Sequence, residues 1–481
     1  MKPLLLSVAG LAFLGLGCTP QPAENTQQPA AEQATETAAP NYAVDVPVTY
    51  YTLDNGLKVV ISPDDTAPIA AVGVYYNIGF RIEPKDRTGF AHLFEHMMFQ
   101  GSENLGKMEL VKLIQNNGGV LNGSTRFDYT NYFEVVPKHT LETMLWAEAD
   151  RMRSLKITQE NLTNQQGVVK NEVKVNVLNQ PYGGFPWLDM PQYAFDNWYN
   201  AHNFYGDLED LDAANLDDVK AFFTQYYSPS NAVLVVVGDV SIDDTKGMIE
   251  KYFANIPSVE PKALPDVTEL AQQKERVHNK YDKLAPKPAY AFAYRMPPRD
   301  TPEYYAMGII DQILVQGNDS LLRKQLVNET GLTGDINGGI NYLLGNMFNY
   351  NGPMLWMAHL THETPEQREA ITQSIDAVMT GLVENPITEA QIELAKTKLK
   401  SDLYDTYEGF FGVGKLDLLA SFALFDDNPG KINQLDEAFA AVTPELIQQT
   451  AKQYLHPGNR TVLTVTPGEA PQATATEGEG E

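Results

Sequence analysis

Hydrophobic and polar positions along the chain alternate between short apolar runs and longer amphipathic stretches. Residues 57–62 and 69–77 alternate or run apolar, which predicts strands, because successive strand side chains point to opposite faces. Residues 110–116, 139–155 and 217–227 have the pattern of helices that bury one face. Strands mixed with helices in this way predict an α+β fold, with a mainly antiparallel sheet on which the helices pack.

One stretch of this pattern occurs twice. Residues 225–238 contain a helix end, a Pro/Asn turn and a β-branched strand, and residues 453–468 repeat this sequence of features 228 positions later. A period of this length indicates a duplicated domain rather than a solenoid. We therefore expect two homologous domains, at 48–255 and 276–467, joined by a Pro-rich linker at 256–275.

The two ends of the chain differ from this core. Residues 1–18 carry a lysine at position 2 and continue as an apolar run too short to span a bilayer, which predicts an export signal. The run ends at Cys18, which resembles the lipidated cysteine of bacterial lipoproteins; a plain secretory peptide is the alternative. Residues 19–47 and 468–481 are poor in large apolar side chains and predict a disordered tether and a disordered acidic tail.

The lipoprotein resemblance implies a location. It places the protein in the cell envelope of a Gram-negative-type bacterium, attached to the membrane through the lipid anchor alone. Thr19 follows Cys18 where an aspartate would favour the inner membrane, so the resemblance implies the outer membrane, facing the periplasm.

Charge excludes one class of partner. The chain has 62 acidic and 35 basic residues, a net charge of −27, whereas nucleic-acid binding needs a basic surface. Without the export signal and the two tails, about −20 belongs to the two domains. This charge is explained either by the solubility of an exported protein or by attraction of basic peptides. A single cysteine also excludes disulfides within the chain and thiolate metal clusters.

The clearest chemical motif is His92-Leu93-Phe94-Glu95-His96. Helix positions i and i+4 share a face, so both imidazoles can reach one ion. Glu95 lies close to the same face and can take a proton from water at a zinc ion. Short motifs also arise by chance, and two histidines can be ordinary core residues. A catalytic zinc site needs a third protein ligand, which the motif itself does not identify.

Further segments carry a family resemblance. The motif lies among four other short segments, at 76–81, 118–125, 168–172 and 179–183. Together they resemble the pitrilysin/insulysin family of zinc metallopeptidases, inverzincins that include the mitochondrial processing peptidases. The resemblance covers residues 48–467 and is strongest from Thr88 to Tyr182. It implies that the two domains face each other as one half of a clamshell.

The resemblance also assigns roles to residues. Glu172, which follows His96 by 76 positions, would be the third ligand of one zinc ion per chain, with Glu95 as general base. Peptide substrate would add as a strand to a sheet edge. The residues implied at that edge are Asn122, Gly123 and Ser124. The implied activity is zinc-dependent hydrolysis of peptides or unfolded polypeptide segments.

The repeat allows a comparison with the second domain. Adding 228 to the four site positions leads to Ser320, Arg323, Lys324 and Lys400, so we expect no metal site there. A different metal site could use His359 and His362, but strand histidines are more often surface or core residues.

Two substrate-gripping residues of the family are missing. Matching on Gly331-Leu332 places Val327 and Gly334 where self-sufficient members carry Arg and Tyr. The chain then resembles the catalytic subunit of a two-chain enzyme, whose homologous partner, or a second copy, supplies these side chains. Alternatively, Arg323 or Tyr342 takes their place. A non-catalytic binding or assembly subunit of a processing-peptidase-like complex is the alternative function.

Overall fold

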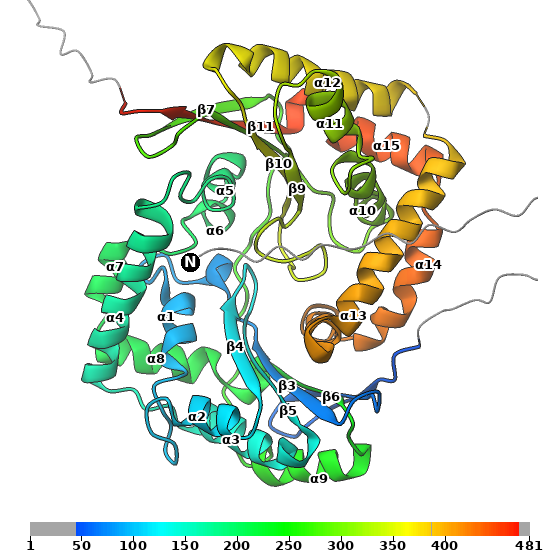
Figure 1. Cartoon of the computed structure of the whole chain (residues 1–481). Helices are drawn as coiled ribbons and strands as arrows, with labels where there is room; N and C mark the ends of the chain where they lie inside the picture. The colour runs from blue at the N-terminus through cyan, green and yellow to red at the C-terminus, as the bar shows by residue number, and fades with distance from the viewer. Residues whose placement is uncertain (1–44, 386, 471–481) are drawn as a thin grey trace, which may run out of the picture. The chain divides into compact units, whose positions relative to one another are not determined.

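The first half of the chain folds around a six-stranded sheet. The computed structural model describes residues 45–385 and 387–470. The strand order in this sheet is β1-β2-β6-β3-β5-β4, and Figure 1 labels its strands β3, β4, β5 and β6. Its strands are β1 (Thr49–Thr52), β2 (Lys58–Pro63), β3 (Ile69–Tyr76), β4 (Val120–Thr125), β5 (Thr130–Pro137) and β6 (Ala232–Gly238).

The second half repeats this arrangement with five strands. The strand order is β7-β11-β8-β10-β9. The strands are β7 (Arg276–Asp282), β8 (Ala289–Arg295), β9 (Asn337–Ile340), β10 (Leu355–Thr361) and β11 (Arg460–Pro467). Within the described residues, each sheet has one parallel strand pair, β2–β6 or β7–β11, and its other pairs are antiparallel. The predicted α+β fold of two similar, mainly antiparallel sheets is confirmed.

Side-chain alternation divides the first sheet between two cores. Leu234 on β6 and Val72 on β3 point to the face that packs with the helices of the first half, because alternate strand residues point the same way. Val233 and Val235 on β6 point to the other face and join the core of the second half. The helices of the first half are α1 (Phe90–Met97), α2 (Glu109–Asn116), α3 (Leu141–Arg153), α4 (Gln159–Val173), α5 (Asp189–Ala194), α6 (Trp198–Ala201), α7 (Leu208–Ala213), α8 (Leu216–Tyr226) and α9 (Ile242–Phe253).

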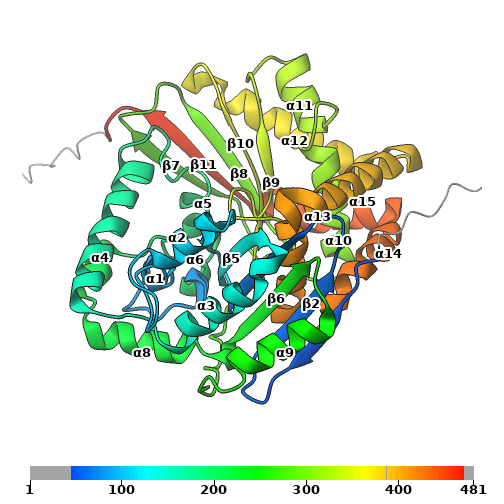
Figure 2. The same ribbon diagram turned by 60° about the horizontal axis from the view of Figure 1, so that its bottom comes forward.

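The second half contributes the longest helix of the described chain, which crosses to the first sheet. Helix α13 (Glu389–Asp426) starts after Thr388, whose side chain forms a capping box with Gln391. It packs on β3 and β6, and Figure 2 shows it in orange next to β2 and β6. The other helices of this half are α10 (Pro302–Leu314), α11 (Leu321–Arg323), α12 (Arg368–Glu384), α14 (Leu435–Ala440) and α15 (Pro444–Tyr454).

Element boundaries differ from the sequence predictions by a few residues. The helix predicted at 139–155 is α3, and the helix predicted at 217–227 is α8. Residues 257–275, within the predicted linker, contain no helix or strand, and all the described residues belong to one compact unit. Within the described part of the chain, no helix is both long and apolar enough to cross a bilayer. Cys18 and nearly all of the tether predicted after it lie outside the described residues.

Candidate metal centre

Helix α1 presents the two motif histidines from a fixed position. It begins after Gly89, which has a φ of 80°, a left-handed conformation that favours glycine. The buried Glu83 carboxylate accepts hydrogen bonds from the backbone N–H groups of Gly89 and Ala91, at 2.8 and 2.5 Å. These N–H groups have no partner within the helix, so Glu83 satisfies them. A carboxylate at this place also interacts favourably with the positive end of the helix dipole. The start of α1 is therefore anchored by a carboxylate rather than by an N-cap side chain.

The predicted ligands meet at one point. Nε2 of His92 lies 3.4 Å from Nε2 of His96; Oε1 of Glu172 lies 3.6 Å from the former, and Oε2 of Glu172 lies 3.2 Å from the latter. Tetrahedral zinc with ligands at about 2.0–2.1 Å separates its ligand atoms by about 3.3 Å. The three side chains form the one metal-ligand group of this kind within the described residues. Two imidazoles and one carboxylate at these separations fit a zinc ion with an open position.

The protonation states suit metal binding. Burial lowers the pKa of His92, which favours the neutral imidazole. A hydrogen bond from His96 lowers the pKa of Glu172, which favours the ionised carboxylate. These are the forms that bind a metal ion.

Glu95 has a partner that the sequence did not suggest. The Thr125 hydroxyl, at the end of β4, donates a hydrogen bond of 2.6 Å to Oε2 of Glu95. Thr125 is only 4% exposed, so its end of this contact is shielded from water. The hydroxyl therefore fixes one carboxylate oxygen and leaves Oε1 for other contacts.

The implied substrate edge lies beside this carboxylate. Strand β4 is the last strand in the sheet order, and a Cβ added to Gly123 would lie 3.4 Å from Cγ of Glu95. Asn122 Oδ1 accepts a hydrogen bond from the Gly123 N–H, and Ser124 Oγ donates one to Asn131. An edge strand has backbone groups that a further strand can pair with. The structure thus brings the implied substrate residues next to Glu95.

A tyrosine that sequence reasoning missed also reaches the metal centre. The Tyr205 ring packs against His92 with centroids 5.1 Å apart, and its hydroxyl lies near the Glu172 carboxylate, whose pKa it helps to lower. Burial raises the pKa of Tyr205 to about 12, which favours the protonated phenol. Tyr205 stands in a loop 33 positions after Glu172, and no local spacing marks it as part of the site.

In the second domain, the helix that corresponds to α1 is not the one that the offset of 228 predicted. Tyr76 on β3 pairs with Ala232, and Tyr294 on β8 pairs with Arg460, so the offset is 228 at the last strand but 218 at this one. Helix α10 follows β8 as α1 follows β3, whereas the predicted Ser320, Arg323 and Lys324 lie at α11. The constant offset was therefore wrong for the helix. Helix α10 contains neither histidine nor cysteine.

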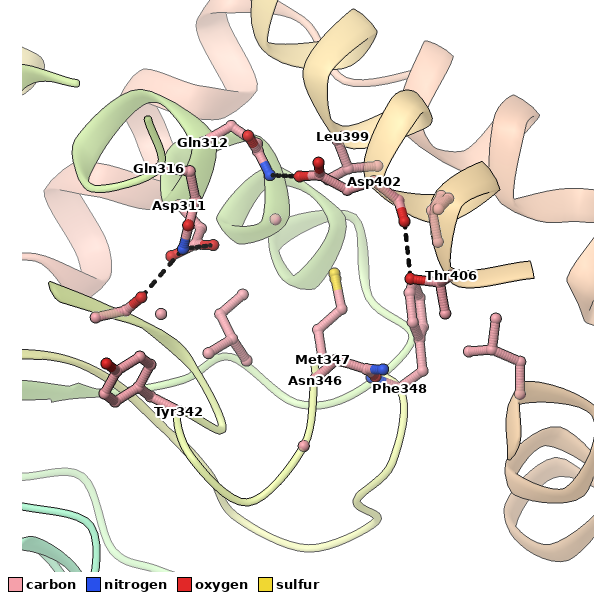
Figure 3. Close-up of a pocket in the computed structure, with 17 residues that line it drawn as sticks. Asp311, Gln312, Gln316, Tyr342, Asn346, Met347, Phe348, Leu399, Asp402 and Thr406 are labelled. Carbon is pink, nitrogen blue, oxygen red and sulfur yellow. Dashed lines mark hydrogen bonds between the residues drawn. The ribbon is translucent and has the colours of Figure 1, made fainter. Parts of the chain in front are cut away.

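A cavity of about 320 Å³ lies between α10, β9 and α13 (Figure 3). Asp311 accepts hydrogen bonds there from Trp356 and Gln316, at 2.7 and 3.0 Å. Asp402 on α13 accepts a hydrogen bond from Gln312. Polar and apolar side chains line the cavity, with no histidine or cysteine among them.

The remaining candidates have structural partners. Arg323 pairs with Asp335, and Tyr342 packs against His359 with ring centroids 5.5 Å apart. His362 contacts the Thr364 carbonyl, and His359 and His362 form no metal-ligand group in the described residues. The positions of the missing Arg and Tyr lie in the π-helical segment Lys324–Glu329, for Val327, and just before β9, for Gly334.

Two family models match the chain. The model described as Insulinase (Peptidase family M16) matches residues 58–183, and the model described as Peptidase M16 inactive domain matches residues 213–399. The zinc protease PqqE of Helicobacter pylori is 26% identical over 424 residues, which cover 86% of this chain and 92% of that protein. The mitochondrial-processing peptidase subunit beta of Lentinula edodes is 23% identical, with 84% and 86% covered.

Solved structures share the fold. A protease from Helicobacter pylori superposes with a TM-score of 0.79 at 24% identity, covering 88% of this chain and 100% of that chain. A peptidase M16 inactive domain from Pseudomonas fluorescens gives a TM-score of 0.77 at 17% identity, covering 89% and 99%. At these identities the likeness is one of fold.

Proposed function

Because both domains of the chain belong to peptidase family M16, we propose that the protein is a zinc-dependent endopeptidase acting on peptides or unfolded polypeptide segments. The observation that carries the proposal is the cluster of ligand atoms from His92, His96 and Glu172, in which the two imidazole Nε2 atoms lie 3.4 Å apart and each lies 3.2–3.6 Å from one oxygen of the Glu172 carboxylate. The name of the Helicobacter pylori relative, a zinc protease, supports the same activity.

The three ligands have one role and Glu95 another. A zinc ion at this point would act as a Lewis acid toward the scissile carbonyl and toward water. Glu95, one position before His96, accepts a proton from the attacking water and returns it to the leaving amine. Thr125 keeps the Glu95 carboxylate oriented through its hydrogen bond. The chain thus provides an oriented base on the same helix as the two proposed histidine ligands.

The edge of β4 provides the substrate position. An extended peptide paired with Asn122, Gly123 and Ser124 would run beside Glu95, because Gly123 lies next to this side chain. Because this pairing uses backbone groups, the edge can bind peptides of many sequences, as a peptidase of unfolded segments requires.

Variants of the base and of a ligand test the proposal. Glu95→Gln should keep zinc and lose cleavage of a quenched peptide library, whereas His96→Ala should lose both. Glu160→Gln, at the exposed start of α4, serves as the matched control. Normal cleavage by Glu95→Gln would refute the mechanism. A wild-type chain that binds zinc and cleaves nothing would favour the binding or assembly subunit.

A partner subunit is the second part of the proposal. Val327 and Gly334 offer no side-chain donor where self-sufficient relatives of this kind carry Arg and Tyr. We therefore expect a homologous chain, or a second copy, to supply oxyanion-stabilising donors, which are usually a large part of catalysis. Cleavage should rise when the product of a neighbouring homologous gene is added. Equal rates with and without that protein would exclude a required partner of different sequence.

Export and anchoring complete the proposal. The pattern of residues 1–18 supports an envelope protein lipidated at Cys18 and held at the outer membrane. Cells given a labelled fatty acid should label the wild type and leave Cys18→Ser unlabelled. A wild-type protein that is exported without label would favour the plain secretory peptide.

A further inference from the structure

Tyr205 occupies a buried position between two of the proposed ligands. Its side chain is only 7% exposed, and its ring lies edge-on to His92, at an interplanar angle of 62°. Its hydroxyl lies near the Glu172 carboxylate. A phenol at this place is a neutral donor that leaves the charge of the ligand set unchanged.

The loop that carries Tyr205 is locked to helix α1. A Cβ on Gly206 would lie 2.3 Å from the Gly89 nitrogen, and a Cβ on Gly89 would lie 2.7 Å from the Tyr205 carbonyl oxygen. Both glycines have positive φ, 75° and 80°, so their backbones approach as only glycine allows. The helix that carries His92 and the loop that carries Tyr205 are therefore packed backbone to backbone.

Hydrogen bonds reinforce this contact. The Thr88 hydroxyl, shortly before α1, accepts from the Asp207 N–H at 2.8 Å and donates to Asp210 at 2.6 Å. The backbone N–H of Tyr205 donates to Asn203 Oδ1 at 3.1 Å. The position of the phenol relative to α1 is thus fixed on both sides of Tyr205.

A second side chain orients the phenol. Asn176 follows Glu172 by four positions, in the π-helical segment Lys174–Leu178, and its side chain lies near the Tyr205 hydroxyl. An Asn176 amide that donates to the phenol oxygen would direct the phenol proton to the Glu172 carboxylate, which can only accept.

Glu172 is the ligand that most needs such support. Its side chain is 29% exposed, against 6% for His92, and it comes from α4 rather than from the motif helix. Metal ligands are commonly oriented by neighbouring hydrogen-bond donors, whose loss weakens metal binding.

We propose that Tyr205 is a positioning residue, which holds Glu172 in its ligand orientation by donating a hydrogen bond to the carboxylate. This inference rests on the proposed zinc site. Asn176 sets the direction of the phenol, and the Gly89–Gly206 contact fixes its distance from α1.

Zinc affinity is the measurement that tests this role. In competition with a chelator, Tyr205→Phe should bind zinc about 10–100-fold more weakly than the wild type, because it keeps the ring and loses the donor. Asn176→Ala should show a smaller loss. Trp187→Phe is the control, because Trp187 packs on the Tyr205 ring with centroids 5.9 Å apart. The absorption spectrum of the cobalt-loaded chain should change in Tyr205→Phe and stay unchanged in Trp187→Phe.

The outcomes separate this inference from the proposed function. Wild-type zinc affinity in Tyr205→Phe, or equal weakening in Trp187→Phe, would overturn the positioning role. A fall in kcat with unchanged zinc affinity would also overturn it, since the phenol would then act on substrate. If the affinities follow the expected order but the wild type cleaves no peptide, the positioning role stands and the peptidase proposal fails.

Discussion

Thr125 donates its hydroxyl hydrogen bond to Oε2 of Glu95 at 2.6 Å, which joins the edge strand β4 to the helix that carries both histidines. Hydrogen bonds to charged groups contribute about 1.5–3 kcal/mol, so losing this one should disturb the base. We expect Thr125→Val to lower kcat about tenfold or more while zinc content stays unchanged. Thr125→Ser should restore most of the rate. Wild-type kcat in Thr125→Val would contradict the assigned orientation of Glu95.

The sequence predicts the local part of this site and misses the rest. His92 and His96 are four positions apart, so helix geometry alone places them on one face. Glu172 is distant in sequence, and family resemblance rather than spacing identified it. Thr125 and Tyr205 reach the site from a strand and a loop, and an isolated Thr or Tyr carries no local signal of such contacts.

In the repeat as well, the sequence reveals a local feature, the shared turn, but not the lengths of the connections between elements. The turn before the last strand of each domain is similar enough in sequence to reveal two related sheets. Connection lengths are not visible in the same way: residues 77–89 link β3 to α1, but only residues 296–301 link β8 to α10. A constant offset therefore fails at the helix, although it holds at the final strand.

Metal removal should destabilise the folded chain. A ligand bound only to the native state stabilises it by about 2.7 kcal/mol at 100 times its Kd. We therefore expect a chelator to lower the Tm of the wild type by several degrees and to leave the Tm of His96→Ala unchanged. His139→Ala, an exposed histidine outside the site, should respond like the wild type. Equal Tm values for the wild type with and without chelator would speak against a structural contribution from zinc.

Asp417 links α13 to the first domain. One of its oxygens accepts hydrogen bonds of 3.0 Å from the hydroxyls of Tyr75 and Tyr129, and the other accepts from Asn349. Asp417→Leu leaves these donors without an acceptor, and each such group costs about 1–3 kcal/mol. We expect urea unfolding to show a free energy lower by several kcal/mol. Asp405→Asn, an exposed acid on the same helix, is the control, and similar losses in both variants would argue against the link.

Asp311 gives the second domain a specific pH dependence. Burial raises the pKa of this carboxyl to about 7, although it accepts hydrogen bonds from Trp356 and Gln316. In the unfolded chain the carboxyl has its ordinary pKa of 3.8. Between these values the folded state holds a proton that the unfolded state has released. Stability from this group is therefore present below the lower pKa and is lost as the pH rises toward 7.

Replacing the titrating carboxyl of Asp311 should abolish this pH dependence. Asp311→Asn keeps an acceptor for Trp356, and Gln316 can turn its amide to face the new side chain at the loss of its hydrogen bond to the Gly338 carbonyl. Because the side chain partly contacts the cavity, we expect a gain on the order of 1–2 kcal/mol at pH 8 and little change at pH 4. Urea unfolding across this range measures it, with Glu303→Gln on the same helix as control. Parallel pH curves for the wild type and Asp311→Asn would mean that the carboxyl is ionised throughout, with the cavity supplying enough water to solvate it.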